Sequence, residues 1–245
     1  MFRSVTTPEE LILKCRNIAF IDLGAGEFSA LYASSFALYI ADMGHKVCYT
    51  ECDVPERKRA LLYDSIAVDS RFKRTGFIDF YEMARDDKKL YGDENTDEGV
   101  NWRIITPQDV RGNIVLTPAQ MGRLIFSARG DLCIYDFGCC DMYDVFFEDM
   151  DALIFLVDPM PSRIIRASER IHEMQRLAAN NRNHLWVVYN MNPGVSKRQV
   201  KSVIRDNAIT WIEHLDDSLV YAAEYRGVYP WETAEIRELL TESFG

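Results

Sequence analysis

The stretch from Ile18 to Leu31 holds residues of the kind that bind phosphate groups. It reads Ile-Ala-Phe-Ile-Asp-Leu-Gly-Ala-Gly-Glu-Phe-Ser-Ala-Leu, which is a strand-like run, a glycine turn and the start of a helix. The backbone amides of such a turn, and the N-terminus of the helix that follows it, attract anions. Gly24, Gly26 and Ser29 are therefore candidate nucleotide-binding residues, and the two glycines are also what a tight turn requires.

Polar residues follow three other strand-like runs. Asp53, Asp136 and Asn190 each stand where such a run ends. In a parallel sheet the carboxyl ends of the strands meet at one edge, and ligands bind at that edge. We expect these three side chains to lie at the same edge as the glycine turn, either binding a ligand or capping the loops that begin there.

Strand-like and helix-like segments alternate along most of the chain. A sheet built from short apolar runs separated by helices is parallel and covered on both faces. The sequence therefore predicts an α/β fold, a single domain over residues 1–245 with a mostly parallel, doubly wound sheet. The expected strands are 17–23, 46–50, 100–105, 132–136, 152–158, 184–190 and 208–213, and the expected helices are 29–43, 118–129, 162–179, 196–206, 219–225 and 233–243.

The remaining segments are less regular. Thr7-Pro8-Glu9-Glu10 places an N-cap residue before a proline and acids, so residues 1–16 are expected to include an N-terminal helix. The other expectations are a helix at 54–63, short strands at 75–80 and 113–116, and an exposed acidic loop at 86–99.

Two classes of nucleotide-binding turn compete for residues 24–29. The segment is close to the dinucleotide pattern G-x-G-x-x-G/A, in which Glu51 would bind the ribose. Glu51 lies 27 positions after Gly24, whereas that fingerprint places its acid about 20 residues further on. The longer spacing favours the P-loop class.

The order of these motifs resembles that of the MinD/ParA-like ATPases with a deviant Walker A motif. That family has a strand, then K-G-G-x-G-K-T, a long helix ending in G-x-x-V, and a strand ending in D-x-D. The corresponding segments are 18–23, Gly24-Ala-Gly-Glu-Phe-Ser-Ala30, Gly44-His-Lys-Val47 and Glu51-Cys-Asp53, followed by the strand that ends at Asp136 and by 151–159, 187–190 and 217–230.

The resemblance implies a P-loop NTPase fold and a role for each strand-end residue. An acid at the position of Asp53 orients the attacking water in the family, and an acid at the position of Asp136 holds Mg²⁺ through water. An asparagine at the position of Asn190 borders the adenine. These roles make the three residues candidates for cofactor binding beside Gly24, Gly26 and Ser29.

The loop departs from the family pattern at the positions that carry the chemistry. Ser29 stands where the phosphate-binding lysine is expected, and Gly24 where the signature lysine is expected. Ala30 replaces the hydroxyl residue that holds Mg²⁺, and Phe28 replaces the last glycine of the loop. Glu27 brings a carboxylate to the same turn. Phosphoryl transfer depends on positioned positive charge and metal, so no catalytic residue is assigned.

The composition limits the partners. The net charge of −10 argues against direct binding to nucleic acid or to an anionic membrane. Six cysteines without a CxxC pair, and the lack of a long apolar stretch, favour a reducing cytoplasm and no membrane insertion. The four histidines show no metal or catalytic spacing, so no metal site is expected.

The resulting hypothesis is a catalytically impaired MinD/ParA-like protein that acts through protein contacts. Its partner is another protein, with a homodimer as one candidate, and a localisation factor of the TadZ/CpaE type for a pilus or secretion machine fits the resemblance. Two alternatives remain open: an ATPase with an atypical phosphate loop, and a dinucleotide-binding enzyme of the NAD type. No cofactor is assigned, and ATP with Mg²⁺ is the candidate to test.

Overall fold

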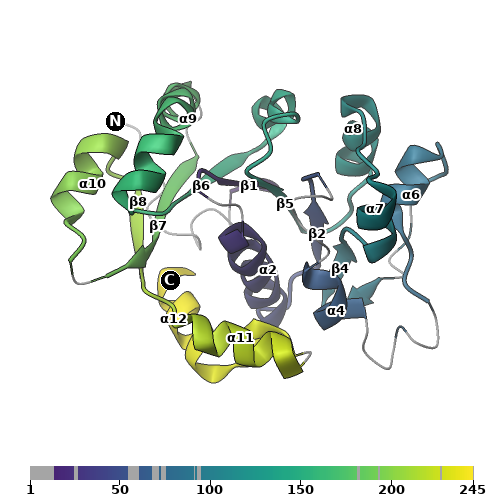
Figure 1. Cartoon of the computed structure of the whole chain (residues 1–245). Coiled ribbons are helices and arrows are strands. Elements are labelled where there is room, and N and C mark those ends of the chain that lie inside the picture. Colours follow the sequence, from purple (N-terminus) through teal and green to yellow (C-terminus); the bar gives the residue numbers. More distant parts are fainter. Residues whose placement is uncertain are drawn as a thin grey trace.

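One eight-stranded sheet forms the centre of the fold (Figure 1). The strands lie in the order β3-β4-β2-β5-β1-β6-β7-β8, and every pair is parallel except β3 with β4. The structure is a computed structural model that describes residues 14–24, 27–54, 61–67, 72, 76–90, 92, 95–180, 183–192, 194–226 and 228–244.

The strands expected from the alternation are all present. Their apolar residues fill the sheet, as a parallel sheet covered on both faces requires. Their bounds are β1 Asn17–Asp22, β2 Val47–Glu51, β3 Thr96–Asp97, β4 Val100–Arg103, β5 Leu132–Gly138, β6 Ala152–Val157, β7 His184–Met191 and β8 Ile209–Glu213.

The helices expected from the alternation are present as well. They begin and end within a few residues of the expected positions. The described helices are α2 Glu27–Asp42, α4 Leu61–Ala67, α6 Phe80–Arg85, α7 Pro107–Gly112, α8 Pro118–Phe126, α9 Pro161–Asn180, α10 Lys197–Ile204, α11 Asp217–Arg226 and α12 Ala234–Phe244, with 3₁₀ turns η1 Asp144–Asp149 and η2 Pro230–Glu232.

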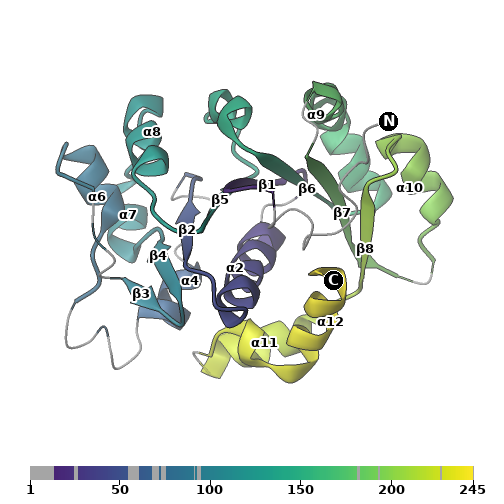
Figure 2. The same ribbon diagram turned by 180° about the vertical axis from the view of Figure 1, so that it is seen from behind.

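Two hydrophobic cores lie on opposite faces of the sheet (Figures 1 and 2). Alternate residues of β1 show the division, since Phe20 belongs to one core and Ala19 to the other. The first core contains α2, α4 and α12, and the second contains α6, α8, η1, α9 and α10. Helix α2 is apolar on nearly all sides because it is buried between the sheet and α12.

The strand order reverses at β1, so the loop that follows β1 has a special position. From β1 the chain goes to β2 on one side of it, and later to β6 on the other. Crevices at the carboxyl edge of such a sheet form where the strand order reverses. The glycine turn at Gly24 therefore lies at the position where a doubly wound fold binds ligands.

Three local predictions were wrong. Residues 76–79 are not a strand, because the Asp79 side chain accepts the Glu82 N–H at 2.8 Å and caps α6. Residues 113–116 are not a strand either, because Asn113 ends α7 in a left-handed conformation with φ 46°. The expected loop 86–99 is exposed at 86–89, but Thr96 and Asp97 pair with β4.

Two expected helices lie mostly outside the described residues and stay predictions. The N-terminal helix expected in 1–16 falls almost wholly outside the described residues, as does most of the helix expected at 54–63. Among the helices that are described, none is both long enough and apolar enough to cross a membrane.

Two carboxylates, the buried Asp109 and the half-buried Asp79, join α6 to α7 through Thr106. The Thr106 hydroxyl lies 3.0 Å from Asp79 Oδ2 and 2.8 Å from Asp109 Oδ2, and it has a single proton to donate. Asp109 is fully buried and also accepts the Thr106 N–H at 2.8 Å. Burial, assisted by the Asp79 charge, raises the pKa of Asp109 to about 6 against the opposing hydrogen bonds from Thr106.

This pair predicts a pH dependence of stability. Between the ordinary carboxyl pKa and about 6, the folded state binds more protons at Asp109, so the free energy of unfolding falls as the pH rises. In Asp109→Asn that fall disappears. The free energy of unfolding of the variant therefore rises relative to that of the wild type by about 1–3 kcal/mol between pH 4 and pH 7. Urea unfolding at several pH values measures it.

Asp87→Asn is the control, because the Asp87 side chain is 82% exposed. Its pH profile should run parallel to that of the wild type. A parallel profile for Asp109→Asn as well would contradict the prediction.

Candidate functional site

The turn after β1 is held by its own carboxylate and by a tyrosine from β7. The Gly24 N–H donates to Asp22 Oδ1 at 2.6 Å. A Cβ atom at Gly24 would lie 2.7 Å from the Tyr189 hydroxyl oxygen, which is too close for any side chain. Gly24 is therefore required by the close approach of Tyr189 as well as by the turn. Gly26 lies outside the described residues.

The Tyr189 phenol lies between two buried carboxylates. Asp22 and Asp158 are each 2% exposed. Burial first, and then these two charges, raise the pKa of Tyr189, so that the phenol stays protonated and donates a hydrogen bond to Asp22. The hydroxyl thus ties the end of β7 to the end of β1.

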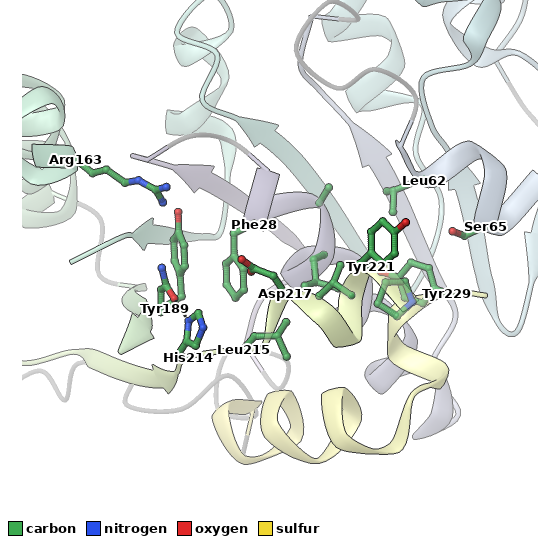
Figure 3. Close-up of a pocket in the computed structure, with 15 residues that line it drawn as sticks. Phe28, Leu62, Ser65, Arg163, Tyr189, His214, Leu215, Asp217, Tyr221 and Tyr229 are labelled. Atoms are coloured by element: carbon green, nitrogen blue, oxygen red, sulfur yellow. Dashed lines mark hydrogen bonds between the residues drawn. The ribbon is translucent and has the colours of Figure 1, made fainter. Parts of the chain in front are cut away.

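Three aromatic rings stack beside the first turn of α2, and Figure 3 shows two of them, Phe28 and Tyr189. The Phe28 and Tyr189 rings have centroids 4.1 Å apart and planes 12° apart. The other neighbour of Phe28 is Tyr32, at 5.7 Å and 21°. Offset stacking of this kind contributes about 0.5–1.5 kcal/mol per pair beyond the burial of area. Phe28, at the position of a loop glycine in the resembling family, is therefore fixed by packing.

Ser29 lies in the first turn of α2 and is fully buried. The residue that the resemblance aligns with the phosphate-binding lysine is thus part of the interior. Ala30, at the position of the Mg²⁺-binding hydroxyl, is 4% exposed and belongs to the core that α2 forms with the sheet.

A chain of polar side chains runs from α9 to the end of β8, and Figure 3 labels its two outer members, Arg163 and His214. Arg163 forms an ion pair with Asp158, whose Oδ2 also accepts the Asn190 amide at 3.3 Å. The amide oxygen of Asn190 bonds His214. Asn190 has φ 61°, a left-handed conformation that asparagine tolerates better than most residues. Both polar atoms of its side chain are engaged within the protein.

The other two predicted acids bond to neighbouring backbone and side chains. Asp136 is fully buried and accepts the Tyr49 hydroxyl and the Gly138 N–H, each at 3.0 Å. Burial, followed by the charge of Asp136, raises the pKa of Tyr49. Asp53 is 1% exposed and accepts the Val54 N–H at 2.7 Å.

Glu51, the acid of the dinucleotide alternative, does not face the glycine turn. Its Oε2 accepts the Ile105 N–H at 2.6 Å, and the side chain is buried. The carboxylate therefore fastens the end of β2 to the segment that follows β4.

A cavity of about 510 Å³ lies next to the aromatic stack (Figure 3). Its walls come from the start of α2, the ends of β7 and β8, α4, α9, α11 and the segment before α12. Most of the lining is apolar or aromatic, as in small-molecule sites of this size. No lysine is among the described residues that line it.

The predicted site residues fall into two groups at the sheet edge. Gly24 and Asn190 are joined through Tyr189 and Asp158, while the Asp136 carbonyl accepts the Cys52 N–H next to Asp53 at 2.7 Å. Sequence reasoning missed Asp22, Asp158, Tyr189, Arg163 and His214 as members of the site. Asp22 and Asp158 carry the same signal that identified Asp53 and Asp136, an acid at the end of a strand.

These features define a doubly wound α/β fold in which Gly24 follows the first strand at the carboxyl edge of the sheet. No protein-family model matches the sequence, and a search of curated proteins finds no significant match. Solved structures do resemble it: a ParA family ATPase from Chlorobium tepidum superposes with a TM-score of 0.67 at 12% identity, covering 94% of this chain and 97% of that one.

Two further structures are similar. A putative plasmid partition protein from Borrelia burgdorferi bound to AMPPNP has a TM-score of 0.66 at 11% identity, covering 94% of this chain and 99% of that one. MinD in the MinC:MinD cell division complex of Aquifex aeolicus has 0.63 at 14%, covering 94% and 93%. The chain therefore has a MinD/ParA-like fold, which confirms the fold that the sequence predicted.

The aromatic stack predicts an energetic coupling between its members. Phe28→Ala and Tyr189→Ala should each lower the free energy of unfolding, and the double variant should lose less than their sum by about 0.5–1.5 kcal/mol. Urea unfolding of the four proteins measures this cycle.

Phe126→Ala provides the control cycle with Phe28→Ala. Phe126 lies on α8, against the opposite face of the sheet, and is 59% exposed. That pair should be additive within about 0.5 kcal/mol. An additive Phe28–Tyr189 cycle would show that the two rings do not support each other.

Proposed function

We propose that this protein is a catalytically impaired member of the MinD/ParA-like group that acts as a positioning or assembly factor through protein contacts. The observation that carries the proposal is the state of the loop, where Phe28 is stacked on Tyr189 and Ser29 is buried in place of a lysine. The fold is retained, and the groups that would neutralise a transferring phosphate are replaced.

The energetic argument concerns charge in the transition state. Removal of one preorganised electrostatic contact typically costs about 3–4 kcal/mol of barrier height. Two lysines and the magnesium hydroxyl are replaced here by Ser29, Gly24 and Ala30. Arg163 is the candidate to replace a missing lysine as the cation, but its guanidinium pairs with the buried Asp158 carboxylate. This pairing weighs against an ATPase that uses another cation.

The similar structures suggest the kind of partner. One of them is a complex of MinD with a second protein, MinC, and another is the protein McdA from Cyanothece, with a TM-score of 0.57 at 15% identity. By analogy, this chain would bind a protein partner or a second copy of itself in the cytoplasm. A pilus or secretion machine is the assembly that the resemblance to TadZ/CpaE-type factors favours.

Thermal unfolding with nucleotides tests the loss of phosphate chemistry. A ligand present at a hundred times its Kd stabilises the folded state by about 2.7 kcal/mol. We expect no shift of the melting temperature with millimolar ATP or ADP, with or without Mg²⁺, and none with NAD(H).

An Mg²⁺-dependent shift with ATP that Asp136→Ala abolishes would contradict the proposal and restore the ATPase alternative. A shift with NAD(H) alone would restore the dinucleotide alternative. Asp97→Ala is the matched control for Asp136→Ala, because Asp97 lies in β3 at the edge of the sheet and outside the cavity lining.

A further inference from the structure

The cavity beside the stack contains ring surfaces on two sides (Figure 3). Phe28 and Tyr189 lie at one side, and Tyr221 and Tyr229 lie across from them. Tyr221 is 68% exposed although it is large and partly apolar, and one of its faces stacks on Tyr225 at 6.1 Å and 21°. Exposed aromatic residues beside a cavity of this size are typical of a binding site.

The two fully charged side chains of the cavity lining differ in whether another residue neutralises them. Arg163 and Asp217 carry full charges, and Arg163 is neutralised by Asp158. Asp217, the first residue of α11, is exposed and makes no ion pair with the residues that the structure describes. The helix N-terminus accounts for an acid at this position, but it does not account for the ring-lined cavity that Asp217 borders.

A carboxylate beside aromatic rings selects a positive group. Aromatic faces attract ammonium and guanidinium ions, and the attraction increases when the site is partly desolvated. The Asp217 carboxylate would repel a phosphate group, and the described lining offers no unpaired cation to offset this repulsion. The net charge of −10 adds to it.

We propose that this cavity binds a small organic cation, an ammonium or guanidinium group carried on an apolar or aromatic body. Asp217 pairs with the cation, and the body packs against Leu215, Val220 and the rings. The volume of about 510 Å³ falls in the range of sites for small molecules. The inference goes beyond the proposed function, because a cation site in this cavity does not require that the loop has lost its affinity for phosphates.

Matched probes test the charge requirement. Phenethylamine and 2-phenylethanol have the same carbon skeleton, and only the amine is charged at neutral pH. Titration of ¹⁵N-labelled protein, followed by amide chemical shifts, gives both Kd values and the location of binding. We expect the amine to bind at least about tenfold more tightly, which corresponds to about 1.4 kcal/mol, with shifts in α11 and the start of α2.

Asp217→Asn should reduce this preference to about threefold or less, because it removes the charge and keeps the size. Asp216→Asn is the matched control and should keep the preference, since Asp216 is a neighbouring exposed acid outside the cavity lining. Tyr221→Ala should weaken the binding of both probes, because the ring packs against the apolar or aromatic body of the ligand.

Equal affinity of the wild type for the two probes would overturn the inference. So would the absence of amine binding at concentrations up to about 10 mM, because ligands of this size bind in the millimolar range. An amine preference that survives Asp217→Asn would do the same. Binding of Mg–ATP together with the amine would overturn the proposed function alone. Absence of both would overturn the cation site and leave the proposed function standing.

Discussion

The stacking of Phe28 on Tyr189 fixes the start of α2 at this edge of the sheet. A P-loop needs backbone amides that are open to a phosphate, and glycine supplies that openness. Here the ring of Phe28 stacks on Tyr189 at 4.1 Å, and the Tyr189 hydroxyl lies where a side chain at Gly24 would be. The interaction joins the start of α2 to the end of β7, so the first turn of the helix is fastened to the other half of the sheet.

The strand-end carboxylates serve the turns at the same edge. Asp22, Asp136 and Asp158 each accept the N–H of the residue two positions later, at 2.6, 3.0 and 2.8 Å. This is the Asx-turn geometry that aspartate adopts in loops. Asp136 therefore has one of the two roles that the sequence left open, capping of its loop, and ligand binding stays a prediction. The edge of the sheet is thus a set of braced turns beside a ring-lined cavity.

The sequence predicted the fold well because its signals are repeated. Apolar runs between helices specify a parallel sheet regardless of any single residue, and the helix expected from residue 118 begins there as α8, with Thr117 as its cap before Pro118. The same signal at Thr106-Pro107 was missed, and with it the capping box of α7. The stack of Phe28 on Tyr189 was beyond prediction, because it joins residues 161 positions apart whose contact depends on the order of the strands.

The central claim is that the fold is retained while the loop has lost its affinity for phosphates. Phosphorus NMR of Mg–ATP tests it directly, since the β and γ resonances report on contacts of those phosphates. The account predicts that stoichiometric protein leaves both resonances unshifted and unbroadened. Shifts that saturate at one equivalent of protein, and that disappear in Asp136→Ala, would contradict it.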